Sequence, residues 1–226
     1  SFACGIENGS NTALKRMNKS ANLETNKKAL DILKKYGIYV QAGYILFDDN
    51  TTFQELKENY DFLREYDWII TKGIFSEMFA ADGTLYAEKL KKEDKIVEND
   101  VYDNNKYEIV DPKVRLTYNA LKKWHKSHMR LYDMIIDPIS SPKAIDTTGE
   151  QAFYDLYYQL KLKDLEFMKM VLDNVEKGIT EGELNEKVMA HIVSNSDFYA
   201  SINRSGQTLC EMYNLNYDGK ENPFIR

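Results

Sequence analysis

The stretch Ala3-Cys4-Gly5-Ile6-Glu7-Asn8-Gly9-Ser10, at the start of the chain, decides the fold that we expect. Its short apolar run ends in Gly-Ile-Glu and breaks at Asn-Gly-Ser, which predicts a buried strand that carries one carboxylate into a turn. A helix should begin after the turn, over residues 13–17. Glu7 is therefore placed at the carboxyl end of a strand, which is where ligands bind in α/β folds.

Two more strands follow at the spacing of a parallel β/α fold. Apolar positions in residues 23–36 fall mainly on one helical face, and Gly37 is the expected stop of that helix. A strand is predicted over 39–47, and a capping box within residues 51–55 opens the next helix. A third strand is predicted over 68–75, with a glycine inside it that marks a bulge or a close approach. This alternation predicts parallel strands joined by right-handed crossovers.

The character of the chain changes after Thr84. We expect a short charged helix over residues 86–95 and a loop or short hairpin over 97–111. Four helices should follow, over residues 114–136, 152–175, 181–193 and 198–213. The clearest break between helices is Pro138-Ile139-Ser140-Ser141-Pro142. We therefore expect two domains, a β/α part over residues 1–111 and a helical subdomain over 112–226.

Three motifs in this order resemble those of radical S-adenosylmethionine (SAM) enzymes. The opening stretch, with Leu14 and Met17-Asn18-Lys19 behind it, is similar to the Gly-Ile-Glu-Ser-Gly-Ser segment in the fourth strand of that family's partial β/α barrel. Residues 40–56 resemble the fifth strand and its exit, and residues 75–85 resemble the exit of the sixth. The resemblance implies about three parallel strands of a partial barrel, followed here by the helical region.

The resemblance also implies an activity. An intact enzyme of this family would cleave SAM reductively at a 4Fe-4S cluster and so start radical chemistry, as an oxidoreductase or methyltransferase, on a substrate that the motifs do not name. It implies cofactor-binding roles for residues at the three strand exits: Glu7, Asn8, Ser10, Gly43, Ile45, Phe79 and Ala80. A carboxylate suits the ribose of SAM because it can accept hydrogen bonds from both hydroxyls. No catalytic residue is assigned.

Simpler interpretations of the same residues stay open. Glu7 could cap the helix that starts near Asn11, and Ser10 is at a typical capping position. The strand around Gly43 and Ile45 could be an ordinary buried strand. The sequence also departs from the family pattern, since Asn8 replaces the commoner Ser, Asp48-Asp49 replaces an Asp-Pro turn, and Ala80-Ala81-Asp82 lacks the usual proline.

The cysteines limit what this chain could do alone. A 4Fe-4S cluster of the family needs three closely spaced thiolates, and the sequence has only Cys4 and Cys210. We therefore expect the C-terminal segment of a longer enzyme, a fragment that is inactive by itself. The Gly-Ile-Glu form is frequent in family members with a cobalamin-binding domain, so cobalamin stays open as a further cofactor.

Composition excludes some classes of function. The net charge is −6 and the isoelectric point is near 5.3, which argues against a nucleic-acid-binding protein. No run of 18 or more apolar residues and no leading signal segment occur, so we expect a cytoplasmic protein that does not insert into membranes. Lys-rich runs such as 15–19 carry interleaved polar residues and are interpreted as solvated faces. His125 and His128 could share a helical face, but no third ligand accompanies them, and no metal site is expected.

Two other classes of function remain. The helical region could bind a partner while the β/α part serves as a non-catalytic scaffold, or the chain could come from an unrelated barrel enzyme. The outer edge of the first strand also lacks a predicted neighbour. Exposed strand edges pair with other chains, so we expect that edge to be covered, either in a homodimer or by the helical region.

Overall fold

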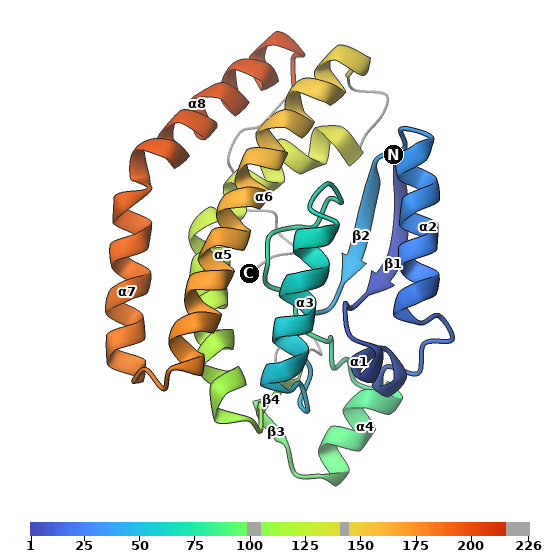
Figure 1. Ribbon diagram of the computed structural model, residues 1–226, viewed down its shortest axis with the longest axis vertical. Coiled ribbons are helices and arrows are strands. Elements are labelled where there is room, and N and C mark those ends of the chain that lie inside the picture. Colours follow the sequence, from blue (N-terminus) through green and yellow to red (C-terminus); the bar gives the residue numbers. More distant parts are fainter. Residues whose placement is uncertain (99–104, 141–144, 216–226) are drawn as a thin grey trace.

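The computed structural model describes residues 1–98, 105–140 and 145–215. A small parallel sheet lies on one side of the molecule and a stack of long helices on the other (Figure 1). The elements are, in chain order, β1 (Phe2–Glu7), α1 (Asn11–Arg16), α2 (Leu23–Lys35), β2 (Val40–Tyr44), α3 (Phe53–Glu65), α4 (Leu85–Lys92), β3 (Ile96–Glu98), β4 (Lys106–Tyr107), α5 (Pro112–Ser140), α6 (Thr147–Glu176), α7 (Glu181–Ser194) and α8 (Ser196–Met212). The described residues are mostly helical, as the run of helices after residue 112 predicts.

The sheet has two regular strands. β1 pairs in parallel with β2, with Gly5 opposite Gly43. The segment after α3 also runs parallel to β2, but it forms only two isolated bridges, Gln41 to Ile70 and Phe47 to Glu77. The predicted third strand therefore has the expected position and direction, but it is not a regular strand. Between the two bridges, residues 71–76 lie opposite residues 42–46. The third segment has one residue more than β2 there, which shifts its register as a β-bulge does.

Gly73 explains why this bulge forms where it does. Its φ is +72°, a conformation that favours glycine. A Cβ atom at this position would lie 2.7 Å from Nδ1 of His125 and 3.0 Å from the ring of Tyr132, both on α5. Both predicted roles of this glycine, a bulge and a close approach, are present together.

Local capping signals work as predicted in the β/α part. Gly37 follows α2 with φ of +67°. Thr52 and Glu55 form a complete capping box at the start of α3. The charged helix and the hairpin are present as α4 and as the antiparallel pair β3–β4, although residues 99–104 lie outside the described part of the chain.

The predicted break over residues 138–142 starts later than expected, because α5 continues through Pro138 to Ser140 and α6 begins at Thr147, with residues 141–144 outside the described part of the chain. A proline inside a helix loses one backbone hydrogen bond and costs about 3 kcal/mol. Here it lies in the last turn, where Ile135 and Ile139 are both buried in the helical core. Their burial, worth about 2 kcal/mol for each side chain, offsets that cost.

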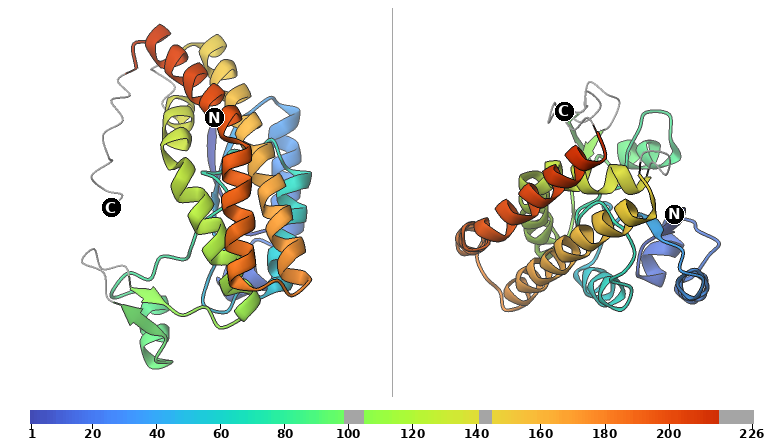
Figure 2. Two further views of the ribbon diagram at one scale, coloured as in Figure 1. Left: turned by 90° about the vertical axis from the view of Figure 1, so that its left-hand side faces the viewer. Right: turned by 90° about the horizontal axis from the view of Figure 1, so that it is seen from above.

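Two apolar clusters hold the elements together. In the smaller one, Ile6 and Val40 of the sheet pack against Leu30 of α2, Phe62 of α3 and Leu165 of α6. Helices α2 and α3 therefore cover one face of the sheet, and α6 packs against α3 beside them (Figures 1 and 2). The larger cluster joins α5, α6, α7 and α8 to the end of β2, so apolar packing runs across the predicted domain boundary at residue 111. The division into two domains stays a prediction.

A buried polar group also joins the two parts of the chain. Lys161 of α6 is fully buried, and its Nζ donates a hydrogen bond to Oγ1 of Thr71 (2.5 Å) in the third, bulged segment. Asp164, one turn later, accepts from Nε1 of Trp124 (2.8 Å) and from the hydroxyl of Tyr132 (2.7 Å). Burial lowers the pKa of Lys161 and raises the pKa of Asp164.

The outer edge of β1 has no strand beside it in the described residues, where β1 pairs with β2 alone. Phe2, at the start of this edge, is 57% exposed. Coverage of the edge by a second chain therefore stays a prediction. Among the helices that the structure describes, none is both long and apolar enough to cross a membrane.

A buried histidine shapes the core of the helical region. His128 lies beside Trp124, which stacks on Phe167 with ring centres 4.0 Å apart. Nδ1 of His128 lies 2.9 Å from the carbonyl oxygen of Trp124, so this nitrogen carries the proton of the neutral ring. Burial lowers the pKa of His128 to about 4, and the nearby His191 adds to the effect.

We expect this histidine to make folding sensitive to acid. Below pH 6.5 the unfolded chain binds a proton that the folded chain refuses until about pH 4, so stability falls as the pH drops through this range. Urea unfolding at pH 7 and pH 4.5 would measure this. The free energy of unfolding of His128→Asn should fall between these pH values by about 2 kcal/mol less than that of the wild type. The exposed change Lys126→Gln should fall as the wild type does, and a wild-type fall in His128→Asn would contradict the assignment.

Candidate functional site

The three strand exits meet at one rim of the sheet, at the lower end in Figure 1. Glu7 is the last residue of β1, and its carbonyl oxygen accepts a hydrogen bond from Ile45 N (2.6 Å) just after β2. Asp48 follows β2, and Phe79 follows Met78, whose N–H donates to the carbonyl of Phe47 (2.8 Å). Glu7, Asp48 and Phe79 therefore lie on the same rim, as parallel strands require.

Glu7 has a strained backbone. A hydrogen bond from Asn8 N to Ile6 O (2.9 Å) closes a three-residue γ-turn with Glu7 at its centre. The φ of Glu7 is +67°, and γ-turns with positive φ are rare and strained. Strain of this kind costs about 1–3 kcal/mol and persists only where the surroundings impose it, which occurs most often at functional sites.

The carboxylate of Glu7 is partly accessible. Its Oε1 pairs with Nζ of Lys19 at 2.8 Å, and the Glu7 side chain is 17% exposed. Gly5 makes room for it, because a Cβ atom at Gly5 would lie 2.8 Å from the same oxygen. Glu7 does not cap α1, because the N-cap residue is Ser10. Ser10 therefore occupies the predicted capping position, but its side chain makes no capping bond, and its Oγ pairs instead with Oγ1 of Thr12 (2.9 Å).

Asn8 is buried and uses its amide within the protein. Its Nδ2 donates to the carbonyl of Ile45 (2.7 Å), and its Oδ1 accepts from Ser10 N and from Nδ2 of Asn59, both at 2.9 Å. The amide therefore ties the turn after β1 to β2 and α3.

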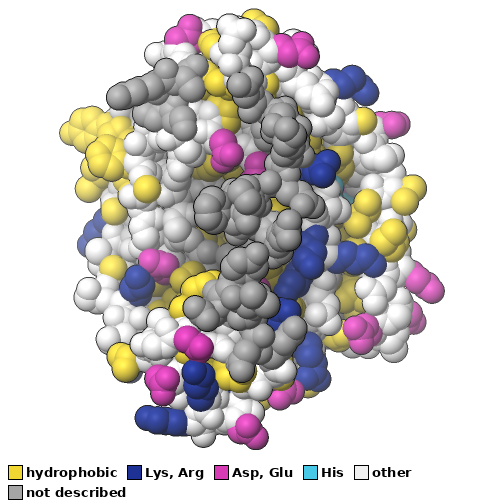
Figure 3. Space-filling model, turned by 180° about the vertical axis from the view of Figure 1, so that it is seen from behind, with side chains coloured by type: hydrophobic (Ala, Val, Ile, Leu, Met, Phe, Trp, Pro, Cys, Tyr) yellow, Lys and Arg dark blue, Asp and Glu magenta, His cyan; other side chains and the backbone are white. Residues whose placement is uncertain are grey.

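Gly43 and Ile45 face away from the helices that cover the sheet. Side chains alternate along a strand, and Val40 and Ala42 point to α2 and α3, so Gly43 belongs to the opposite face. Gly43 is exposed and Ile45 is half-buried. This face lies on the side of the molecule drawn in Figure 3, where charged side chains of both signs are spread among hydrophobic ones.

Phe79 and Ala80 differ in exposure. Phe79 is 57% exposed at the rim, whereas Ala80 is fully buried. The carbonyl of Ala80 accepts from N and Nδ2 of Asn105 (3.1 and 2.9 Å), the residue before β4, which ties the β3–β4 hairpin to the third exit. Nζ of Lys95, the residue before β3, donates to the carboxylate of Asp49 (2.7 Å) and so ties the start of the hairpin to the loop after β2. Burial acts to raise the pKa of Asp49, but hydrogen bonds from Lys95 and Lys89 outweigh it and hold the pKa below its usual value.

Arg16 forms a clamp at the rim that sequence reasoning missed. Its Nε donates to Oδ2 of Asp48 (2.8 Å), and its two terminal nitrogens donate to the carboxylate of Glu55 (2.8 and 2.9 Å). Thr12 donates to the same carboxylate (2.6 Å). The run 15–19 was expected to be a solvated face, and for Arg16 this is wrong, because the guanidinium reaches two nearly buried acids. Capping boxes place Glu55 reliably, but nothing local in the sequence indicates its partner.

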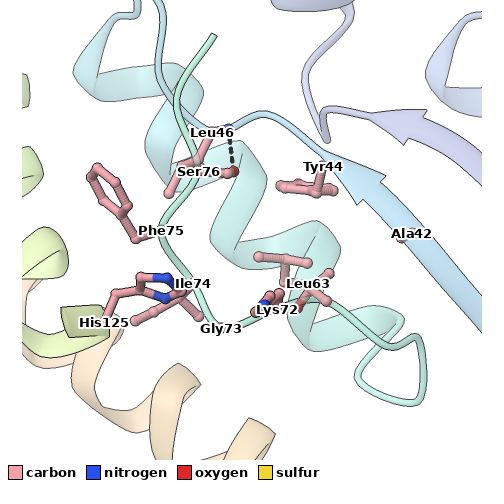
Figure 4. Close-up of a pocket in the computed structure, with 11 residues that line it drawn as sticks. Ala42, Tyr44, Leu46, Leu63, Lys72, Gly73, Ile74, Phe75, Ser76 and His125 are labelled. Carbon is pink, nitrogen blue, oxygen red and sulfur yellow. Dashed lines mark hydrogen bonds between the residues drawn. The ribbon is translucent and has the colours of Figure 1, made fainter. Parts of the chain in front are cut away.

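A separate cavity of about 230 Å³ lies between β2 and the bulged segment (Figure 4). Ala42 and Tyr44 of β2 line it together with Leu46 just after the strand, so it lies on the face opposite Gly43 and Ile45. Its outer wall is residues 71–76, where the Ser76 hydroxyl accepts from Leu46 N (3.0 Å). The cavity results from the bulge and is distinct from the rim.

Potential metal ligands do not gather in the described part of the chain. No group of three or more His, Cys, Asp or Glu side chains there could hold a metal ion. Cys4 is half-buried in β1, and Cys210 is buried in α8. His128 uses Nδ1 to bond the backbone of its own helix.

Comparison with known proteins adds relatives to this geometry. No family model matches the chain. It is 31% identical over 114 residues to the anaerobic magnesium-protoporphyrin IX monomethyl ester cyclase of Rubrivivax gelatinosus, which is 48% of this chain and 18% of that protein. It is 42% identical over 64 residues to the 4'-phospho-dehydrooxetanocin synthase of Priestia megaterium, 28% of this chain and 9% of that protein. The matches thus span less than a fifth of each relative.

Solved structures share the fold. The cobalamin-dependent S-adenosylmethionine radical enzyme OxsB, solved with aqua-cobalamin and also with aqua-cobalamin and S-adenosylmethionine, aligns with a TM-score of 0.61 at 18% identity. The alignment covers 99% of this chain and 38% of that one.

The fold and the rim first define a class of protein. It is a parallel β/α unit joined to a helical region, and its strand exits converge around the carboxylate of a residue with a strained backbone. The comparisons agree with the motifs. The chain is similar, over part of each, to the cyclase and the synthase, and it shares the fold of the S-adenosylmethionine radical enzyme OxsB.

The Arg16 clamp should be important for stability. We expect Arg16→Ala to lower the free energy of unfolding by about 2 kcal/mol, because it leaves the nearly buried Asp48 and Glu55 without their cationic partner. Guanidinium unfolding would measure this. Lys28→Ala is the control, since Lys28 pairs with Glu24 on an exposed helix face and should matter by less than about 0.5 kcal/mol. If Arg16→Ala lowered the free energy of unfolding as little as Lys28→Ala does, the clamp would not be needed for stability.

Proposed function

We propose that this chain is the C-terminal part of the SAM-binding partial β/α barrel of a radical SAM enzyme, with its helical region attached. The observation that carries the proposal is the strained γ-turn at Glu7, which holds a partly accessible carboxylate at the rim. The three motifs that resemble this family, the partial matches to the two curated relatives and the shared fold of OxsB support it. The parallel course of β1, β2 and the bulged third segment agrees with successive barrel strands.

In this proposal Glu7 accepts hydrogen bonds from the ribose hydroxyls of SAM, with Lys19 as a neighbouring cation that must share or release the carboxylate. Gly43 and Ile45 border the adenine, and the absence of a side chain at Gly43 leaves that face of the sheet open for it. Phe79 is the accessible apolar side chain of the third exit. Asn8, Ser10 and Ala80, which are buried, act by shaping the turns and not by direct contact.

SAM bound at a reduced 4Fe-4S cluster would supply a 5′-deoxyadenosyl radical. The residues of this chain fit the SAM part of such a site, since Gly5 leaves the space that the Glu7 carboxylate uses. They do not fit the cluster, because two separated cysteines cannot supply three thiolates. The cluster ligands would belong to another part of a longer protein, and this chain alone would be inactive.

The further cofactor and the substrate are wider proposals. OxsB is described as cobalamin-dependent, so the longer enzyme could use cobalamin, although no residue of this chain is assigned to it. The two curated relatives carry names that point to a porphyrin ester and a phosphorylated oxetanocin compound, and these do not agree on one substrate. We propose an unassigned small-molecule substrate and a cytoplasmic enzyme.

Glu7→Gln should weaken SAM binding to the intact enzyme by about tenfold, because an amide replaces one charged acceptor by a donor. Calorimetric titration with SAM and an assay for 5′-deoxyadenosine under reducing, anaerobic conditions would test this. Glu24→Gln, an exposed change on α2, is the matched control. Unchanged SAM binding in Glu7→Gln would refute the role of Glu7, and absence of 5′-deoxyadenosine with the cluster present would refute the reaction.

This chain, produced alone, is expected to dimerise through the free edge of β1. An unpaired parallel strand offers a row of backbone donors and acceptors to a second chain, and Phe2 adds apolar surface. Sedimentation velocity over a wide concentration range should show a dimer that Phe2→Lys weakens. A monomer at every concentration would contradict this, and would leave the edge to other parts of the intact enzyme.

A further inference from the structure

Two buried asparagines interlock behind Glu7. Asn59, on α3, is fully buried, and its Nδ2 donates to Oδ1 of Asn8 (2.9 Å) and to the carbonyl of Glu55 (2.7 Å). Its Oδ1 accepts from Gly9 N (2.8 Å) and from the hydroxyl of Tyr44. Both donors and both acceptor positions of the Asn59 amide are therefore used.

Asn8 carries the connection to the turn itself. Its Nδ2 donates to the carbonyl of Ile45 (2.7 Å), while the N–H of Ile45 donates to the carbonyl of Glu7 (2.6 Å). Ile45, just after β2, thus bonds both the backbone carbonyl of Glu7 and the side chain of Asn8. Asn59 then fixes Asn8 and the N–H of Gly9 to α3.

The turn has no room to relax. A Cβ atom at Gly9 would lie 2.7 Å from Cβ of Phe62 on α3, so backbone and helix already touch. Ile6, before Glu7, is held by Nδ2 of Asn26 (3.0 Å), which donates to its carbonyl. A residue other than glycine returns from positive φ to a relaxed conformation unless such contacts prevent it.

We propose that Asn8 and Asn59 are a positioning pair, which fixes the γ-turn and thereby aims the Glu7 carboxylate at the ribose of SAM. This inference rests on the proposed function. Neither amide contacts the cofactor; both act through Glu7. Lys19 is not the positioning group, because its side chain is 43% exposed and bonds only the carboxylate, not the backbone that is strained.

A double-mutant cycle on the intact enzyme tests the pair. Asn59→Ala should weaken SAM binding about tenfold when Glu7 is present, and by less than about twofold in the Glu7→Gln background, because the pair acts through that carboxylate. The loss of unfolding free energy caused by Asn59→Ala should be the same in both backgrounds. A SAM analogue without the ribose 2′-hydroxyl should be bound almost equally with and without Asn59→Ala.

Two further variants keep the test decisive. Should Asn59→Ala fail to fold, Tyr44→Phe removes one hydroxyl donor to the Asn59 amide and should show the same dependence on Glu7, with a smaller loss of affinity. Asn174→Ala is the matched control, since its amide bonds a backbone carbonyl of α6 far along the chain from the rim and should leave SAM binding unchanged.

The outcomes separate the two levels of the proposal. Equal weakening by Asn59→Ala in the Glu7 and Glu7→Gln backgrounds would overturn the positioning role while leaving the ribose contact of Glu7 intact. Wild-type SAM binding in Glu7→Gln would overturn the proposed function itself. Weaker SAM binding that depends on Glu7, with equal stability losses, is the result that supports the pair.

Discussion

The rim depends on the hydrogen bonds of one buried amide, that of Asn59. An amide taken out of water costs free energy unless each donor and acceptor finds a partner, and Asn59 finds four, on β1's exit, on β2 and on its own helix. Those partners lie far apart in sequence. Satisfying this one group therefore brings the turn after β1, the end of β2 and α3 into a single arrangement, and the strained conformation of Glu7 follows from it.

Charged groups complete the same rim. Arg16 bonds two acids from different elements, and Lys95 and Lys89 bond the nearly buried Asp49. Buried charges are tolerated only with partners of opposite sign and good geometry. These contacts fix the loop after β2 to α1, to α3 and to the β3–β4 hairpin. The carboxylate of Glu7, in contrast, keeps part of its surface accessible. Within the rim, that difference separates structural acids from the one suited to bind a ligand.

The helical region is joined to the sheet by the irregular segment between them. Gly73 allows α5 to approach the bulge, while Lys161 bonds Thr71 from α6 on the other side. Apolar packing continues across this junction. The helices thus support the third strand-like segment, whose ladder contributes only two bridges. A regular central strand would need no such support, so the helical region contributes directly to the shape of the proposed cofactor site.

Local patterns in the sequence determined the elements. Alternating apolar positions, the capping box at Thr52 and the stop at Gly37 each act within a few residues, and the motifs around Glu7 show a family resemblance within a short stretch. The position of Glu7 on a common rim also followed, because parallel strands share their direction. The tertiary structure alone decided the strain at Glu7, the partners of Arg16 and Asn59 and the passage of α5 through Pro138. Each of these depends on contacts between residues far apart in the chain, where burial and hydrogen-bond satisfaction outweigh local propensity.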